Sequence, residues 1–285
     1  MKRPADGERT YLVTTAYDGT DYVGWQFQPN GVSIQQALED AFERITGQRT
    51  TLRAAGRTDA GVHALAMPAD FTVPLELDVA ELTRAWDAVT PRDISVREVR
   101  SVAAGFSARR LARRRTYRYL LLNRRRPSPF LARWCWHIPD KLDIKTIRAA
   151  LPAILGEHDF STFRAADCEA GHPIRRVFAA ELSVFDEAPA AGQPASAGYA
   201  GGPEDGLLAI TIAGKAFLKH QVRSIVGTLM EVGRGKMTAA DFAAILGAAK
   251  RSLAGPTAPA HGLTFVGVDF DEADLRGESG AGRKE

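Results

Sequence analysis

The spacing of apolar residues alternates between a strand-like and a helix-like pattern along most of the chain. Thr10–Tyr17 (TYLVTTAY) is rich in β-branched and aromatic residues, which predicts a strand. Ser33 and Gln36 form a capping-box pattern, and apolar residues at helical spacing continue from there to Gly47, which predicts a helix. Further strands are predicted over 51–55, 66–73, 94–99, 116–122, 176–185, 207–212 and 263–270, and further helices from Asp78, Asp143, Phe217 and Thr238.

These elements do not follow a strict strand–helix–strand alternation, and this favours an α+β fold of two similar mixed halves with largely antiparallel sheets. A boundary near residue 105 would separate an N-terminal domain, 1–105, from a C-terminal domain, 106–270. The stretch 187–206 is rich in Ala, Gly and Pro and is predicted to be a mobile loop within the second domain. The polar tail, 271–285, is predicted to be disordered.

The overall composition is that of a soluble globular protein, with 45% hydrophobic and 25% charged residues. No apolar run approaches the ~20 residues of a membrane span, and the N-terminus has no apolar signal-peptide region. Cys135 and Cys168 are the only cysteines, which argues against a disulfide framework and fits a cytoplasmic protein.

The formal net charge is only +3, but the arginines are unevenly distributed. A dense run without acidic residues is typical of a surface that binds phosphate, whereas a merely solvated face usually mixes both signs. We therefore expect a polyanionic partner. The run contains Arg109, Arg110, Arg113, Arg114, Arg115, Arg118, Arg124, Arg125 and Arg126.

The stretch GRTDAGVHA, from Gly56 to Ala64, is the densest group of candidate site residues. Asp59 before Ala-Gly is a common turn sequence, with Gly61 supplying a positive φ. A turn requires neither Arg57 nor His63, however, and Arg57 beside Asp59 would keep the carboxylate ionised, as a nucleophile or base needs. Both interpretations of Asp59, as a turn residue and as a catalyst, remain open on spacing alone.

Two other segments carry candidate site residues. In RRTYRY (114–119), a strand would place Tyr117 and Tyr119 on one face, where they would either stack on bases or form an aromatic core. In FLKHQVRSIVG (217–227), Arg223 lies at helical spacing from Lys219. A lone helical arginine is usually solvated, and it would matter here only if it faced the Asp59 loop.

No motif indicates a metal or a cofactor. GRGKM (233–237) lacks the Ser or Thr that follows the lysine of a phosphate-binding loop. His158, Asp159, Asp167, Cys168 and His172 match no usual zinc spacing, so a polar loop is favoured there.

Taken together, these segments resemble the tRNA pseudouridine synthase A family. The resemblance begins in YDGTDYVGWQFQPNGVSIQQALEDA and continues through AAGRTDAGVHA and FSARRLARRRTYRY. It resumes in GEHDFSTFRAADCEAGHPIRR and FLKHQVRSIVG and ends in PAHGLTFVGVDF. The pattern G-R-T-D-x-G-V-H-A is highly specific to this family, and the resemblance implies the pseudouridine synthase fold.

The resemblance also implies site residues and a substrate. Asp59 would be the catalytic nucleophile or base, Tyr117 would contact the uracil, Arg223 would pair with the aspartate, and Leu263 would pack on the base. Arg57 would help displace the flipped nucleotide. The family modifies uridines 38, 39 and 40 in the anticodon arm of tRNA, as a homodimer without a cofactor or required metal. Arg109, Arg110, Arg113, Arg114 and Arg115 are the expected phosphate contacts.

Several positions depart from the usual pattern of the family. Met67 and Asp70 stand where Gln and His are common, and Pro68 falls inside a predicted strand, which would then be an edge strand or bulged. Ser107 stands where His is common, and Gln221 where Met is common. None of the implied catalytic residues is changed.

Three functional hypotheses follow. The first is a tRNA pseudouridine synthase, in which Asp59 either attacks C1′ covalently or removes a ribose proton to give a glycal. The second is a non-catalytic tRNA-binding chaperone. The third is a metal-dependent hydrolase using His158 and His172, and it is the weakest because their spacing is unsuitable.

Overall fold

The computed structural model describes residues 8–185 and 206–276, which fall into two compact units. The first unit extends to Thr116 and resumes at Thr264, and the second runs from Tyr117 to Leu263. The predicted boundary near residue 105 is therefore wrong. A single boundary along the sequence cannot separate the two units, because the last strand of the chain returns to the first unit.

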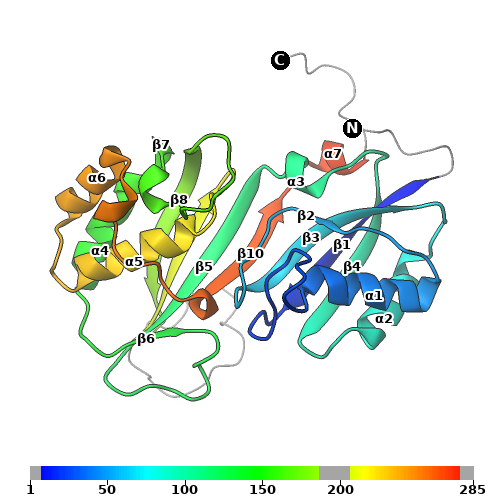
Figure 1. The fold of residues 1–285 in the computed structure, drawn as a ribbon, viewed down its shortest axis with the longest axis horizontal. Helices are drawn as coiled ribbons and strands as arrows, with labels where there is room; N and C mark the ends of the chain where they lie inside the picture. The colour runs from blue at the N-terminus through cyan, green and yellow to red at the C-terminus, as the bar shows by residue number, and fades with distance from the viewer. Residues whose placement is uncertain (1–7, 186–205, 277–285) are drawn as a thin grey trace, which may run out of the picture. The chain divides into compact units, whose positions relative to one another are not determined.

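The first unit is built on strands, with its two longest helices packed side by side on one face (Figure 1). Its sheet has the order β4-β1-β3-β10, β2 pairs with β3, and every pair is antiparallel except β10 with β3. In chain order its elements are β1 (Arg9–Tyr17), α1 (Ile34–Thr46), β2 (Arg53–Ala54), β3 (His63–Val73), α2 (Val79–Val89), β4 (Ile94–Val102), α3 (Ala108–Leu111), the start of β5 (Arg114–Asn123), β10 (Leu263–Asp269) and α7 (Glu272–Arg276).

Alternating side chains of β1 and β3 form the core under α1 and α2. Tyr11 stacks on Phe71 with ring centroids 5.5 Å apart, and Phe71 meets Trp86 of α2 edge-on at 5.6 Å. Phe42 of α1 completes the cluster at 4.9 Å from Trp86, whose indole nitrogen donates to the Leu38 carbonyl. Buried aromatic pairs of this kind fix how the helices lie on the sheet.

The predicted helix termini of this unit are confirmed. The Ser33 hydroxyl accepts a hydrogen bond from the Gln36 amide, and Gly47 ends α1 with φ +68°. The Asp78 carboxylate accepts from the Ala80 and Glu81 amides at the start of α2. Each cap satisfies amides that a helix N-terminus leaves without partners.

The second unit has strands in the order β5-β9-β8-β7, with α4, α5 and α6 packed together (Figure 1). β8 is antiparallel to β7 and β9, and β6 is parallel to β5. Its further elements are β6 (Trp136–Ile138), α4 (Ile144–Ala150), β7 (Gly156–Asp159), β8 (Ile174–Val184), β9 (Leu207–Gly214), α5 (Gln221–Gly233) and α6 (Ala239–Ala248). Both units thus confirm an α+β fold with mostly antiparallel pairing.

Two predictions about local structure need correction. The helix expected from Phe217 begins only at Gln221, because His220 adopts φ +62°. The tail expected to be disordered forms α7 over Glu272–Arg276, with Leu275 buried in an apolar cluster with Phe106. The predicted mobile loop at 187–206 lies outside the described residues except for Gly206.

Pro68 lies within β3 between β1 and β2, so β3 is not an edge strand there. The pairing of β1 with β3 shifts register between Thr15 and Tyr17, whereas Pro68 itself is regularly paired with Thr14. Among the described residues, no helix combines the length and the apolar character needed to cross a membrane.

Candidate active site

Asp59 lies in a tight turn between β2 and β3. The Val62 amide donates to the Asp59 carbonyl at 3.1 Å, and Gly61 has φ +76° at the third turn position. A positive φ there is the signature of a turn that favours glycine. The turn interpretation is thus confirmed for Gly61, and the turn presents a half-buried Asp59 side chain.

The loop after β1 braces the Asp59 turn. The Trp25 amide donates to the Thr58 carbonyl at 3.0 Å, and the hydroxyls of Tyr17 and Thr58 are 2.8 Å apart. Gly24 forms a β-bridge with Asp59 and has φ +108°. A Cβ on Gly24 would lie 2.6 Å from the Thr58 carbonyl oxygen, so only glycine permits this close approach.

His63 is a structural residue of the same loop pair. Its Nδ1 accepts a hydrogen bond from the Gly19 amide at 3.1 Å and lies 3.1 Å from a carboxylate oxygen of Asp18. The ring is only 4% exposed. A Cβ on Gly19 would collide with the Val62 carbonyl oxygen, so the two loops meet backbone to backbone. His63 therefore has a structural, hydrogen-bonding role.

Arg57 is exposed and, among the described residues, forms no ion pair with Asp59. Of the two arrangements that the sequence left open, the side chains therefore point apart. The Arg57 side chain is in solvent, where an anionic ligand can reach it.

Tyr117 and Tyr119 of β5 share one face, as the strand pattern predicts. Tyr117 is 7% exposed and meets Phe217 edge-on, with ring centroids 5.1 Å apart. Tyr119 is fully buried, and its hydroxyl donates to the Pro259 carbonyl at 2.8 Å. Burial raises the pKa of Tyr119 well above its usual range, although the charge of Arg223 opposes this shift. Tyr119 is thus a neutral structural phenol.

Arg223 occupies the first turn of α5. Its Nε donates to the Ala258 carbonyl at 2.8 Å, and the Ala258 amide donates to the Arg223 carbonyl at 3.1 Å. A cation is unfavourable at the positive end of a helix, and this turn contains no acidic residue. The combined positive charge suits an anionic partner. Lys219 lies outside the helix, so it does not precede Arg223 by one turn of α5 as its spacing in the sequence indicated.

The loop and the short 3-10 helix (Ala260–Gly262) before Leu263 are fixed against β5 and α5. A Cβ on Gly262 would meet the Tyr119 ring at 2.5 Å, and a Cβ on Gly227 would collide with the Pro256 carbonyl. Leu263 itself is 6% exposed. The second unit therefore holds Tyr117, Arg223 and Leu263, whereas Arg57 and Asp59 belong to the first unit.

The arginine run does not form a single exposed surface. Arg109 and Arg110 on α3 are exposed, and Arg114 is half-buried. Arg113 pairs with Asp271 at 2.7 Å and with Asp274 at 3.1 Å. Its guanidinium thus also serves to fasten α7. Among the five expected phosphate contacts, Arg109 and Arg110 are the exposed ones and are therefore best placed for phosphate.

Arg115 is buried, unlike the exposed phosphate contact that was predicted for it. It is 8% exposed, and its guanidinium donates to the Ala55 carbonyl at 2.8 and 2.9 Å and to the Arg109 carbonyl at 2.6 Å. A guanidinium saturated by backbone carbonyls inside the protein is unsuited to contact phosphate. Arg115 instead ties the strand before the Asp59 turn to α3.

Asp70 belongs to the same buried network. One carboxylate oxygen accepts from the Ala108 amide at 2.8 Å, where Ser107 makes no side-chain cap of its own. The other oxygen pairs with Arg53 of β2 at 2.7 Å, and the Asp70 side chain is fully buried. Asp70 therefore caps α3 from the neighbouring strand, a role that the sequence pattern did not reveal.

We expect Asp70→Ala to lower the free energy of unfolding by about 2–3 kcal/mol, because it leaves a buried amide and the Arg53 guanidinium without their acceptor. Urea unfolding measures the change. Glu76→Ala is the matched control, because the Arg9–Glu76 pair is 56% and 82% exposed and should contribute less than about 1 kcal/mol. Equal losses in the two variants would contradict a special role for Asp70.

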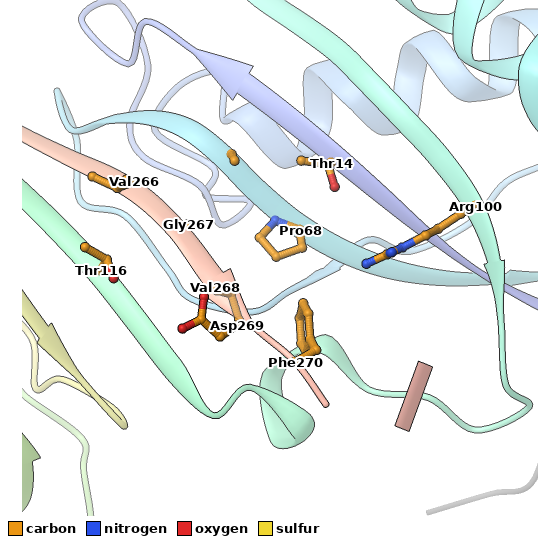
Figure 2. Close-up of a pocket in the computed structure, with 10 residues that line it drawn as sticks. Thr14, Pro68, Arg100, Thr116, Val266, Gly267, Val268, Asp269 and Phe270 are labelled. Carbon is orange, nitrogen blue, oxygen red and sulfur yellow. The ribbon is translucent and has the colours of Figure 1, made fainter. Parts of the chain in front are cut away.

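A separate hollow of ≈ 280 Å³ opens on the sheet of the first unit (Figure 2). Figure 2 shows the Arg100 side chain pointing toward Pro68 and Phe270. Arg100 and Asp269 are its only ionisable lining residues, and none of the predicted site residues lines it. The hollow is therefore not part of the candidate site.

The candidate metal ligands named from the sequence do not form a cluster among the described residues. Within 8–185 and 206–276, no group of three or more His, Cys, Asp or Glu side chains could hold an ion. His158 bonds the Leu155 carbonyl, and Asp167 pairs with Lys219 at 2.6 Å. Cys135 and Cys168 are both free thiols.

A family model described as tRNA pseudouridine synthase matches residues 13–109 and 150–271. The chain belongs to this family. The matched segments contain the Asp59 turn, its bracing loop, Arg223 and Leu263, and they leave out 110–149, where Tyr117 lies.

Close relatives carry the family name over nearly their full length. Proteins named tRNA pseudouridine synthase A are 40% identical in Myxococcus xanthus, 42% in Rhodospirillum centenum and 39% in Geobacter sulfurreducens. These matches cover 90%, 90% and 92% of this chain and 91%, 97% and 100% of the relatives. A chain of a solved Cbf5–Nop10–Gar1 complex aligns with 95% of this chain at TM-score 0.31 and 13% identity, which is too distant to inform the site.

Proposed function

We propose that this protein isomerises uridine to pseudouridine in tRNA, at positions 38, 39 and 40 of the anticodon arm, with Asp59 as the catalytic residue. Membership of the tRNA pseudouridine synthase family supports the reaction. Asp59 is chosen because it lies in a turn that a second loop braces through Gly24 and Trp25. Such bracing holds a carboxylate in one position, as catalysis requires.

The reaction exchanges one bond for another without oxidation. The N1–C1′ glycosidic bond of uridine breaks, the uracil turns, and C5 bonds to C1′. The proton lost from C5 is balanced by one gained at N1, so no redox partner is consumed. A base inside a stem cannot turn, so the uridine must first leave the stack.

The Asp59 carboxylate has two possible roles in this scheme. In the first it attacks C1′ and forms a covalent bond to the ribose, which C5 later displaces. In the second it removes a ribose proton and gives a glycal, to which the proton returns when C5 attacks. Both roles require an ionised carboxylate held close to the sugar.

Arg223 is the proposed partner that orients the Asp59 carboxylate through a charge-assisted pair. Its place in the acid-free first turn of α5 supports this, because the positive helix end and the guanidinium together favour an anion. Tyr117 would contact the loosened uracil and Leu263 would pack on it. A phenol or a water molecule would accept the C5 proton.

Arg57 is proposed to enter the space that the flipped uridine leaves. Its exposure and its lack of an ion pair with Asp59 support this role, because the side chain is available to RNA. A guanidinium plane can both stack on bases and bind phosphate.

The enzyme would act in the cytoplasm as a homodimer without a cofactor. Its two free thiols suit a reducing compartment. Tight phosphate contacts would come from Arg109 and Arg110, and more weakly from Arg113 and Arg114.

The test of the function is to incubate the purified protein with unmodified tRNA and to map pseudouridine at each position. New pseudouridine at 38, 39 or 40 is the expected result. Binding of tRNA without any pseudouridine would instead support the tRNA-binding chaperone. Modification only at other positions would overturn the proposed substrate site.

We expect the Arg109→Ala/Arg110→Ala double variant to raise KM for tRNA and to leave kcat within about 2-fold, because phosphate contacts position the RNA without taking part in chemistry. The plot of log affinity against log salt should become shallower by about 0.7–0.9 for each phosphate that is no longer neutralised. Filter binding at several salt concentrations measures the slope. Arg49→Ala removes an exposed arginine that already pairs with Glu43 at 2.8 Å and serves as the control. An unchanged slope in the double variant would contradict the phosphate role.

A further inference from the structure

A large aromatic side chain is exposed on the loop that braces the Asp59 turn. Phe27, in the loop between β1 and α1, is 57% exposed. Its neighbours Gln26, Gln28 and Asn30 are polar and exposed, and Val32 of the same loop is 54% exposed.

The loop is rigid enough to hold Phe27 in this position. The Phe27 amide donates to the Gln35 side-chain oxygen at 3.1 Å, and the Gln28 side chain donates to the Val23 carbonyl at 3.0 Å. The Val23 amide in turn donates to the Val32 carbonyl at 3.1 Å. These three hydrogen bonds connect different parts of the loop. They therefore hold the backbone at Phe27 in place.

The same bonds connect Phe27 to the candidate site. Trp25, two residues before Phe27, donates to the Thr58 carbonyl at 3.0 Å and accepts from the Gln35 amide at 3.0 Å. Gln35 thus holds both Trp25 and Phe27, while Thr58 lies directly between Arg57 and Asp59. The hydrogen bond from Trp25 to Thr58 therefore joins the loop that carries the exposed Phe27 to the segment that carries the exposed Arg57 and the proposed catalytic residue.

Aromatic rings bind unpaired bases face to face, and a nearby cation binds the adjoining phosphate. We propose that Phe27 stacks on an unpaired base of the tRNA, adjacent to the uridine that enters the site, and so positions the loop of the RNA for modification. This rests on the proposed function. The ligand is identified by its chemistry, as a single-stranded nucleotide with an accessible base face.

The experiment compares Phe27→Ala, Phe27→Leu and Phe27→Trp in pseudouridine formation on unmodified tRNA. We expect KM to rise about 10-fold in the alanine and leucine variants and kcat to stay within about 2-fold, whereas tryptophan should restore the wild-type KM. Leucine separates stacking from simple apolar contact. Phe178→Ala is the matched control, because Phe178 on β8 is 43% exposed and lies in the other unit.

A second measurement identifies the stacked base. Abasic substitutions are introduced one at a time at unpaired positions of the anticodon loop, and each RNA is assayed with wild type and Phe27→Ala. At the stacked position, the two losses should be non-additive. Full additivity at every position, or an unchanged KM in Phe27→Ala, would overturn the inference. A change of oligomeric state in Phe27→Ala, seen by sedimentation, would assign the ring to a protein contact instead.

The failure of this inference is distinguishable from failure of the proposed function. If wild type forms no pseudouridine, the function is wrong whatever Phe27 does. If wild type is active and the variants match it, only the stacking role is wrong.

Discussion

Asp59→Ala should abolish pseudouridine formation, with kcat reduced at least about 10³-fold, because both possible mechanisms require this carboxylate. The affinity for tRNA should change by less than about 3-fold, since phosphate contacts supply most of the binding. Single-turnover assays and filter binding measure the two quantities separately. Appreciable pseudouridine formation by the variant would refute the proposed role.

Two further variants sharpen this result. Asp59→Asn keeps the shape of the side chain and removes its charge, so it should be as inactive as alanine if ionisation is essential. Asp40→Ala removes an exposed carboxylate of α1 and should stay within about 2-fold of wild type. Substantial activity in Asp59→Asn would show that the carboxylate serves to hold the turn and not to react.

Local features of the fold were predictable because local chemistry determines them. Ser33, Asp78, Asp143 and Thr238 each begin the helix that their caps predict. Gly61 has the positive φ that its turn requires. Caps and turns depend on residues a few positions apart, so the sequence contains their full description.

Features set by distant residues were not predictable. The apolar spacing before α5 continues back to Phe217, but His220 adopts a left-handed conformation that ends the pattern. Arg115 resembles any other arginine of a basic run, although β2 and α3 surround its guanidinium with carbonyls. No spacing rule reveals such a site, because the acceptors are backbone atoms whose positions depend on the tertiary fold.

The candidate site contains both features that its local sequence predicts and features that distant residues determine. The Asp59 turn could be recognised from its own residues, but its bracing by Tyr17, Gly24 and Trp25 could not. A signal was nonetheless present in the YDGTDYVGW segment, whose glycines at 19 and 24 are the two points of closest backbone approach. Paired glycines in a loop with aromatic neighbours indicate that another backbone packs there.

Gly24→Ala should therefore impair both stability and catalysis. The φ of +108° is costly for any residue with a Cβ, and the added carbon would lie 2.6 Å from the Thr58 carbonyl oxygen. We expect the free energy of unfolding to fall by about 2–4 kcal/mol. The Asp59 turn must shift to accommodate the methyl group, and a displacement of about 1 Å should lower kcat about 10²-fold. Urea unfolding and single-turnover assays measure the two effects.

Gly47→Ala is the control that separates the backbone strain of a positive φ from displacement of the Asp59 turn. Gly47 also has a positive φ, +68°, but nothing lies within 4 Å of the Cβ that alanine would add, and it ends α1 away from the turn. This variant should lose about 1 kcal/mol of stability and keep wild-type kcat. If Gly24→Ala lost only stability, in the manner of Gly47→Ala, the bracing loop would support the fold without positioning Asp59. A loss of kcat in Gly24→Ala alone would instead show that backbone contact between the two loops sets the position of the catalytic carboxylate.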